Sequence, residues 1–288
     1  MEKQFYIDEI RKNYPNLKFK KIKIIDEGWN NTIVKLDNRF IFRFAKTDNL
    51  FPLKDEIRFL DYFSKFSPLE VPKYIYVPER VNFAGYKMIK GDSLEFSKYH
   101  KLSPHQQKQI QSGLAKFLNA VHSIPLKTAR KFKIKNAWVF ADAVKKAKKR
   151  AKIVAKKLSP GDKKKLSEYL DKLSQSRHSY VKSVMHQDFY EAHILYDFDK
   201  HKLAGIIDFS DVQIGDRAID FRELWFYGKE FMDNIFNFYG SNDKSLRQRS
   251  WDWYIIISID LMYYGITKEK KYWKQGYQII KEKVSSVW

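Results

Sequence analysis

The chain has 288 residues, of which 44% are hydrophobic and 16% aromatic, so a packed core is expected and an intrinsically disordered protein is excluded. It contains no cysteine, which excludes a disulfide framework and thiolate metal sites. The formal net charge of +21 is unevenly spread, because residues 127–165 carry sixteen Lys or Arg against two acidic residues, while residues 186–223 carry nine acidic against four basic residues.

Short strand patterns and two helical patterns alternate in the first part of the chain. Apolar residues recur at helical spacing over 5–13, ending at Tyr14–Pro15, and again over 53–66. Strand-length apolar runs bounded by turn residues lie over 19–25, 32–36, 39–44, 71–76 and 83–89. The sequence therefore predicts a small sheet of about five strands with one inserted helix.

After Gly91 the pattern becomes mostly helical, with helices predicted over 106–122, 138–158, 166–173 and much of 221–284. The apolar run 253–266 contains Asp260 and is shorter than the roughly 20 residues that cross a bilayer. It is therefore predicted to be a buried helix. The charged first residues have no apolar signal core, so we expect a soluble, cytoplasmic protein without a membrane partner. We also expect it to be a monomer.

This order of parts predicts an α+β, bilobal fold of the protein-kinase type. The small lobe, residues 1–89, is expected to be an antiparallel sheet that binds the nucleotide. The large lobe, residues 90–288, is expected to be mainly helical and to carry the catalytic loop and the acceptor site. The nucleotide would then lie in the cleft between the lobes.

Three side chains in the segment 186–220 form a pattern suited to the transfer of a nucleotide phosphate. An HxD pair places Asp188 after His186, His193 follows, and Asp208 ends the apolar strand GIIDF. We predict that Asp188 orients and deprotonates an incoming hydroxyl, while His193 and Asp208 hold Mg²⁺ on the phosphates. His186 is expected to fix the loop through a backbone hydrogen bond. Turn carboxylates beside two strands are the simpler interpretation, but these groups occur together and in the order of the kinase motifs.

The small lobe supplies residues suited to contact with nucleotide phosphates. The turn DEGWNN, between the first two strands, offers Gly28, Asn30 and Asn31, although it lacks a full glycine-rich motif. Arg43 in FIFRF lies where a kinase has its phosphate-binding Lys, and Arg can bind phosphate oxygens with two hydrogen bonds. Glu56, on the following helix, is its expected ion-pair partner. A plain hairpin turn and a solvated surface pair are the alternatives.

The strand 83–89 leads into Lys90–Gly91 and is predicted to be the hinge between the lobes. A bulky residue behind the base could bias the pocket between adenine and guanine, because their edges present opposite hydrogen-bond patterns. The residues expected to contact the base are Lys87 and Ile89 through their backbone groups, Ile41 and Ile207 on the ring faces, and Tyr86 as the gatekeeper.

At these residues the chain resembles the aminoglycoside phosphotransferases, and most closely their 2''-O-phosphotransferase branch. The matching elements are HxDxxxxHIL at 186–195, GIIDF at 205–209, IGDRAIDF at 214–221, FIFRFAK at 40–46 and FAGYKMIKG at 83–91. The resemblance covers essentially the whole chain, and a His at position 193 is itself a mark of that branch. It implies a kinase-like fold, Mg²⁺, ATP or GTP as donor, a polycationic aminoglycoside acceptor and antibiotic resistance. In that branch, a Tyr gatekeeper suggests GTP.

The acceptor is the least constrained part of this prediction. The lysines around Trp273 in TKEKKYWKQG are an unfavourable surface for a cation, so a macrolide, a sugar or a choline-like amine stays open as an acceptor. The acidic residues expected to contact the acceptor are Asp188, Asp211, Glu223, Glu230 and Asp233.

The basic stretch 127–165 leaves open a protein of another class, which binds RNA or the ribosome on a kinase-derived scaffold. Lysine is abundant throughout the chain, so a solvated helix face is favoured and nucleic acid is not an expected partner. A catalytically inactive relative is a third alternative, which the intact Asp188 and Asp208 oppose.

Overall fold

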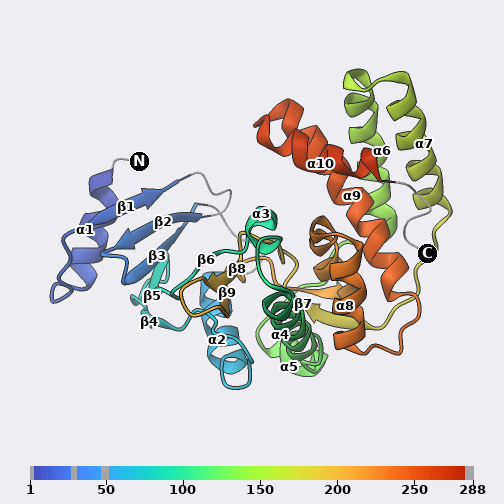
Figure 1. Cartoon of the computed structure of the whole chain (residues 1–288). Coiled ribbons are helices and arrows are strands. Elements are labelled where there is room, and N and C mark those ends of the chain that lie inside the picture. Colours follow the sequence, from blue (N-terminus) through green and yellow to red (C-terminus); the bar gives the residue numbers. More distant parts are fainter. Residues whose placement is uncertain (1–2, 27–30, 47–51, 283–288) are drawn as a thin grey trace.

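The small lobe is a five-stranded antiparallel sheet. A computed structural model of the chain describes residues 3–26, 31–46 and 52–282 (Figure 1). The strands pair in the order β1-β2-β3-β5-β4, and the helix α1 packs beside them. The elements of this lobe are α1 (Lys3–Asn13), β1 (Ile22–Ile25), β2 (Asn31–Leu36), β3 (Phe40–Ala45), α2 (Leu53–Phe63), β4 (Tyr74–Tyr76) and β5 (Phe83–Lys87).

The two faces of strand β3 have different roles because successive residues of a strand point to opposite sides. Phe40, Phe42 and Phe44 pack with Tyr6 and other apolar residues in a small core between the sheet and α1. Ile41 and the buried Arg43 must then point to the other face. The alternation F-I-F-R-F therefore places one charged side chain on the face opposite the aromatic core.

The large lobe begins with short elements that connect it to the sheet. Ser103 caps the long helix α4 through a capping box with Gln106, an arrangement that satisfies two backbone N–H groups at the helix start. The first elements of the large lobe are β6 (Asp92–Ser93), α3 (Phe96–Tyr99), α4 (Pro104–His122), α5 (Leu126–Lys131), α6 (Phe140–Val154), η1 (Ala155–Lys157) and α7 (Pro160–Gln175).

The segment 182–227 lies between α7 and the C-terminal helices. Here β7 pairs with β10, and β8 lies between β6 and β9 in a separate small sheet. The remaining elements are β7 (Lys182–Met185), β8 (Ile194–Asp197), β9 (Lys202–Ile206), β10 (Gln213–Asp216), η2 (Arg217–Phe221), η3 (Glu223–Tyr227), α8 (Lys229–Tyr239), α9 (Leu246–Thr267) and α10 (Lys271–Lys281).

The large lobe has one extensive core, to which α2 of the small lobe also contributes Phe59 and Phe63. Figure 1 shows α6, α7, α9 and α10 gathered at one end of the molecule and the sheet of the small lobe at the other. Most of the run 253–266 is buried within α9, as predicted. Within the described residues, no helix combines the length and apolarity that crossing a membrane requires.

The predicted elements match these in type and differ mainly at their ends. The helix predicted over 166–173 begins earlier, at Pro160, because Ser159 caps it and accepts a hydrogen bond from the N–H of Asp162. Pro at the first helical position suits this start. The strand predicted over 19–25 pairs only from Ile22 onward.

Candidate active site

The segment 186–193 is a loop between strands β7 and β8, and buried hydrogen bonds fix its start. The carboxylate of Asp220 accepts hydrogen bonds from the backbone N–H groups of His186 at 2.8 Å and Gln187 at 2.7 Å. It also contacts Nε2 of His122 at 3.0 Å. Gln187 has a φ of 74°, a conformation that a residue other than glycine adopts only when its surroundings enforce it. Asp220 therefore determines the path of the chain that leads into Asp188.

The loop and the end of strand β9 bring Asp188, His193 and Asp208 together. Nδ1 of His193 lies 2.9 Å from the backbone oxygen of Asp188 and 3.4 Å from its carboxylate. Nε2 of the same ring lies 3.6 Å from Oδ2 of Asp208. The three side chains that the sequence singled out thus form one cluster. His186 donates from Nε2 to the carbonyl oxygen of Ile207 at 3.1 Å, which is the loop-fixing bond expected of it.

Arg43 joins the small lobe to this cluster. Its guanidinium contacts Glu56 at 2.5 Å, the Tyr74 hydroxyl at 2.8 Å and the Asp208 carboxylate at 3.2 Å. The expected ion pair with Glu56 is present and buried, with side-chain exposures of 3% for Arg43 and 0% for Glu56. A buried charge is tolerated only when it is paired and hydrogen-bonded. Arg43 therefore connects α2, β4 and the end of β9.

The surroundings of Asp208 favour its charged form. Burial alone would raise the pKa of Asp208, but the charges of Arg43 and His193 and the hydroxyl of Ser210 hold it well below its ordinary value. Burial would lower the pKa of His193, whereas the carboxylates of Asp188 and Asp208 raise it overall. Asp208 is therefore ionised at neutral pH.

The donor atoms of this cluster suit a magnesium ion held together with phosphate oxygens. The carbonyl oxygen of Asp188 can only accept a hydrogen bond, so Nδ1 of His193 carries a proton. In the neutral ring, Nε2 is therefore unprotonated, and its lone pair lies on the side of Asp208. Among the residues that the structure describes, no three His, Asp or Glu side chains form a complete metal site. Mg²⁺ commonly takes one or two protein ligands and completes its shell with phosphates and water.

The residues expected around the base lie in β3 and β5 and just beyond the ends of β5 and β9. Ile41 on β3 pairs with Tyr86 on β5, and Tyr86 is buried with its ring edge-on to Tyr74 at 5.2 Å. Ile207 donates its N–H to the carbonyl of His193 at 3.0 Å. Lys87 is exposed at the end of β5 and Ile89 is buried just beyond it, while Asn31 is buried at the start of β2 and Gly28 and Asn30 lie outside the described residues.

Two of the expected acceptor contacts lie beside Asp188, in acidic surroundings. Burial, followed by the charges of Asp188 and Asp208, raises the pKa of Asp211 to about 6. Burial also raises the pKa of Glu223 to about 7, with Arg222 opposing the shift and Asp188 adding to it. The raised pKa values mean that the ionised forms of both carboxyl groups are disfavoured. A cation nearby would stabilise these ionised forms, so this position favours a positive charge.

Glu230 and Asp233 are both on helix α8, and within the described ranges no hydrogen bond or ion pair joins either of them to Asp188. Glu230 is exposed in the first turn. Asp233 is paired with Lys229 at 2.8 Å and with Arg247. Their role as acceptor contacts stays a prediction.

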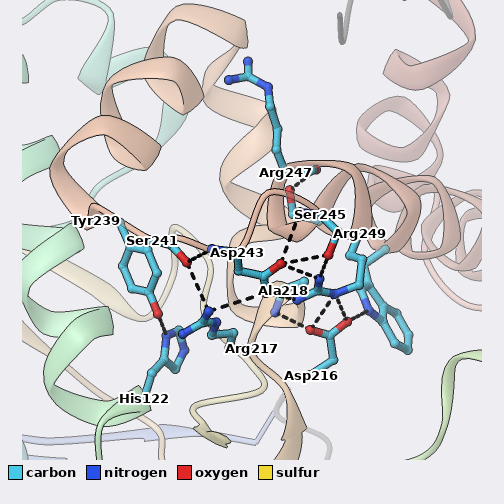
Figure 2. Close-up of polar contacts among 12 residues, drawn as sticks. His122, Asp216, Arg217, Ala218, Tyr239, Ser241, Asp243, Ser245, Arg247 and Arg249 are labelled. Carbon is cyan, nitrogen blue, oxygen red and sulfur yellow. Dashed lines mark hydrogen bonds and ion pairs between the residues drawn. The ribbon is translucent and has the colours of Figure 1, made fainter. Parts of the chain in front are cut away.

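Asp220 and its partners were missed by the sequence analysis, although Asp220 lies inside the motif IGDRAIDF. The same motif supplies Asp216, which accepts hydrogen bonds from Arg249 at 3.0 Å and from the N–H of Ala218 at 3.0 Å (Figure 2). Arg249 also binds Asp243 at 2.8 Å. This buried network anchors the start of η2, and so the position of Asp220, to helix α9.

Known proteins resemble the chain along nearly its whole length. Residues 21–252 match the family model described as the phosphotransferase enzyme family. The GDP complex of wild-type aminoglycoside 2'-phosphotransferase-IIIa matches with a TM-score of 0.82 at 20% identity, over 98% of each chain. ADP-bound aminoglycoside phosphotransferase APH(2'')-Ib gives 0.66 at 21% identity, over 98% of this chain and 97% of that one. Macrolide 2'-phosphotransferase type I gives 0.67 at 17% identity, over 96% of each chain. The predicted kinase-like, bilobal fold is confirmed.

Proposed function

The chain belongs to the phosphotransferase enzyme family, and from this premise we propose that it transfers the γ-phosphoryl group of GTP or ATP to a hydroxyl of an aminoglycoside. The proposed acceptor atom is the 2''-hydroxyl, and the proposed consequence is antibiotic resistance. The observation that carries the proposal is the cluster of Asp188, His193 and Asp208 beneath the buried Arg43–Glu56 pair. We further propose residues 1–89 as the nucleotide-binding lobe and residues 90–288 as the acceptor-binding lobe.

Each residue of the cluster has one task in the proposed reaction. Asp188 orients the acceptor hydroxyl and receives its proton as the new oxygen–phosphorus bond forms and the bond to the β-phosphate oxygen breaks. His193 and Asp208 would hold Mg²⁺, which when bound offsets the negative charge of the phosphates. Arg43 keeps Asp208 in place through their contact at 3.2 Å.

The metal assignment is tested by comparing two variants. Asp208→Ala should lose magnesium-dependent nucleotide binding, while His193→Ala should lose only part of it, because a carboxylate oxygen is a harder ligand than an imidazole nitrogen. Isothermal titration with and without Mg²⁺ measures both. If both variants bind the nucleotide with the magnesium dependence of the wild type, the metal assignment is wrong.

The donor is proposed to be GTP in preference to ATP, because the buried Tyr86 stands on the strand that leads into the hinge. Relatives of similar fold are described as GDP and ADP complexes, so both nucleotides belong in the comparison. Steady-state kinetics with each nucleotide test the preference. A clear ATP preference that Tyr86→Ala leaves unchanged would remove the gatekeeper argument.

The proposal of an aminoglycoside acceptor rests on the acidic surroundings of Asp188. The alternative acceptors for the same phosphoryl transfer are a macrolide, a sugar or a choline-like amine. The test is a screen of nucleotide turnover by purified protein against aminoglycosides, macrolides and simple sugars, with growth of expressing bacteria as the second measurement. Turnover with a macrolide alone, and no protection against aminoglycosides, would overturn the acceptor while leaving the kinase activity intact.

A further inference from the structure

A groove of about 650 Å³ lies on the large lobe between helix α4, the turn of the β8–β9 hairpin and the end of helix α8. None of its lining residues is assigned to the nucleotide, the metal or the acceptor, so the groove is separate from the proposed site of transfer. Its volume lies within the range of about 300–1,000 Å³ that is usual for ligand sites.

The inner part of the lining is mostly apolar. Gly113, in the middle of α4, allows a close approach of the hairpin, because a Cβ atom there would lie 2.6 Å from Cδ1 of Leu203 on β9. Beside this contact Ile110 is 1% exposed, and Leu69 and Leu203 are half-buried. A ligand that enters the groove therefore meets aliphatic surface.

Tyr196 on β8 adds a hydroxyl without a partner to this lining. Tyr196 is opposite Leu203 in the pairing of β8 with β9, and residues directly opposite each other point to the same face of a sheet. Both side chains therefore point toward α4. The Tyr196 hydroxyl is buried and makes no hydrogen bond to any described residue, although buried polar groups normally make one. An oxygen of a ligand would satisfy it.

The outer part of the lining is basic. Four Lys and two His line the groove, and no Asp or Glu does. Lys200 lies 3.7 Å from Asp197, whereas Lys108, Lys116 and Lys202 have no ion pair among the residues that the structure describes. The surplus positive charge favours an anionic ligand.

The basic residues are spread along the groove. From His105 to Lys116, α4 advances about 16 Å at 1.5 Å per residue, and Lys200 and Lys202 belong to the opposite wall. A compact anion such as phosphate is held by donors that converge on one point. An extended peptide advances about 3.3 Å per residue, so about five residues span this length, with alternate side chains on opposite sides.

A nucleic acid strand also carries evenly spaced negative charges, but its bases bind by stacking on aromatic side chains. Among the Phe, Tyr and Trp residues of the lining, Phe238 is 38% exposed and Tyr196 only 1%. The groove thus offers one such ring beside a larger aliphatic surface, which suits apolar side chains better than a row of bases.

We infer that this groove is a docking site for an extended segment of a partner protein in which acidic and apolar residues alternate. The apolar side chains of the segment lie against Ile110 and Leu203, its carboxylates face the lysines, and one of its oxygens accepts a hydrogen bond from Tyr196. The inference goes beyond the proposed function and does not depend on it.

Fluorescence anisotropy with the full chain and a labelled, end-capped peptide Glu-Leu-Glu-Leu-Glu tests the inference, at about 0.15 M salt to screen distant charges. The peptide Glu-Gly-Glu-Gly-Glu has the same charge without the apolar side chains and should bind severalfold more weakly. Lys116→Glu and Lys202→Glu should each weaken binding of the first peptide severalfold. Lys164→Glu is the matched control, because it makes the same charge change on an exposed residue of α7 outside the groove.

Two further variants separate the apolar and polar contributions. Phe238→Ala should weaken binding of the leucine peptide and leave the glycine peptide unchanged. Tyr196→Phe should also weaken binding, without lowering the stability of the free protein, because its hydroxyl has no partner there. No binding of the leucine peptide, equal binding of both peptides, an equal loss in Lys164→Glu, or tighter binding of a five-nucleotide uridine strand would each overturn the inference.

Discussion

At the scale of single residues, Arg43 is the side chain on which the geometry of the site depends most. It contacts Glu56, Tyr74 and Asp208, which come from a helix, a strand and the loop after a second strand. The planar guanidinium can serve all three at once because it has five N–H donors in a fixed arrangement. A Lys at this position would offer a single point charge and could not hold all three partners in the same geometry.

Replacing Arg43 with Ala should destabilise the fold strongly, because the buried Glu56 would lose its opposite charge and keep only the hydrogen bond from the Tyr74 hydroxyl at 3.2 Å. Loss of one member of a buried pair costs about 3–5 kcal/mol of unfolding free energy. Urea denaturation measures this directly. Arg58→Ala is the control, because Arg58 is about half exposed and, among the described residues, its one ion pair is with Asp55 at 3.4 Å. Equal effects of the two substitutions would contradict the structural importance of the Arg43 pair.

Asp188→Asn should abolish transfer while nucleotide binding survives. The amide cannot receive the proton of the acceptor hydroxyl, so turnover should fall by about a hundredfold or more. Stopped-time assays of phosphorylated acceptor, together with titration of the nucleotide, separate the two effects. Turnover close to that of the wild type would rule out the role of Asp188.

Glu223 should make stability depend on pH. Burial raises its pKa to about 7 from 4.5, so the folded protein keeps a proton that the unfolded chain loses between these values. The free energy of unfolding should therefore fall as pH rises through this window. Glu223→Gln should be more stable than the wild type by roughly 3 kcal/mol at pH 8 and nearly equal to it near pH 4.5, as measured by urea denaturation. The same difference at both pH values would contradict this assignment.

At the scale of elements, the C-terminal lobe depends on close contact between helices. Helices α9 and α10 approach so closely at Gly276 that a Cβ atom there would lie 2.4 Å from the carbonyl oxygen of Ser258 and 2.7 Å from the N–H of Met262. Both neighbours are backbone atoms, which cannot rotate away. The helix α9 in turn carries Arg249 and Trp253, which hold Asp216.

Gly276→Ala should therefore force α10 away from α9 and destabilise the protein by about 1–3 kcal/mol, the usual range for overpacking a core. Thermal or urea denaturation measures the change. Gly161→Ala is the control, because no described atom outside its chain neighbours and its own helix backbone lies within 4 Å of the added Cβ, and alanine is a better helix former than glycine. A neutral effect of Gly276→Ala would mean that the two helices can separate at little cost.

At the scale of the whole molecule, the charge is divided between two regions. Residues 186–223 carry a net negative charge within a strongly basic chain. Charges beyond about 8–10 Å are largely screened at physiological salt, so a cationic acceptor near Asp188 responds mainly to the local carboxylates and not to the distant lysines.

Raised ionic strength should accordingly raise the KM for a cationic acceptor, with the nucleotide held at saturation. Salt weakens the local attraction, and the distant repulsion is already screened. The measurement is a series of KM values over increasing salt, with an uncharged acceptor analogue as the control. An acceptor KM that falls with salt would indicate that the basic surface, and not the acidic site, dominates the encounter.

The sequence by itself determined the order of the elements and the identity of the clustered residues. The periodicity of apolar residues depends only on local geometry, so the strands around Arg43 and the helix that holds Trp253 could be predicted. The motifs that contain Asp188, His193 and Asp208 also could be read from the sequence, because short spacing and fixed order identify them.

The tertiary structure alone decided which distant groups complete the site. Asp220 binds the backbone N–H groups of His186 and Gln187, and His122 on α4 binds Asp220, but no local pattern relates these positions. The groove beside Gly113 likewise needs α4 and the β8–β9 hairpin to pack together. Contacts between residues far apart in sequence form when the elements pack together. The free energy of burial depends on the area removed from water and on close packing, and not on the spacing of the residues in the sequence.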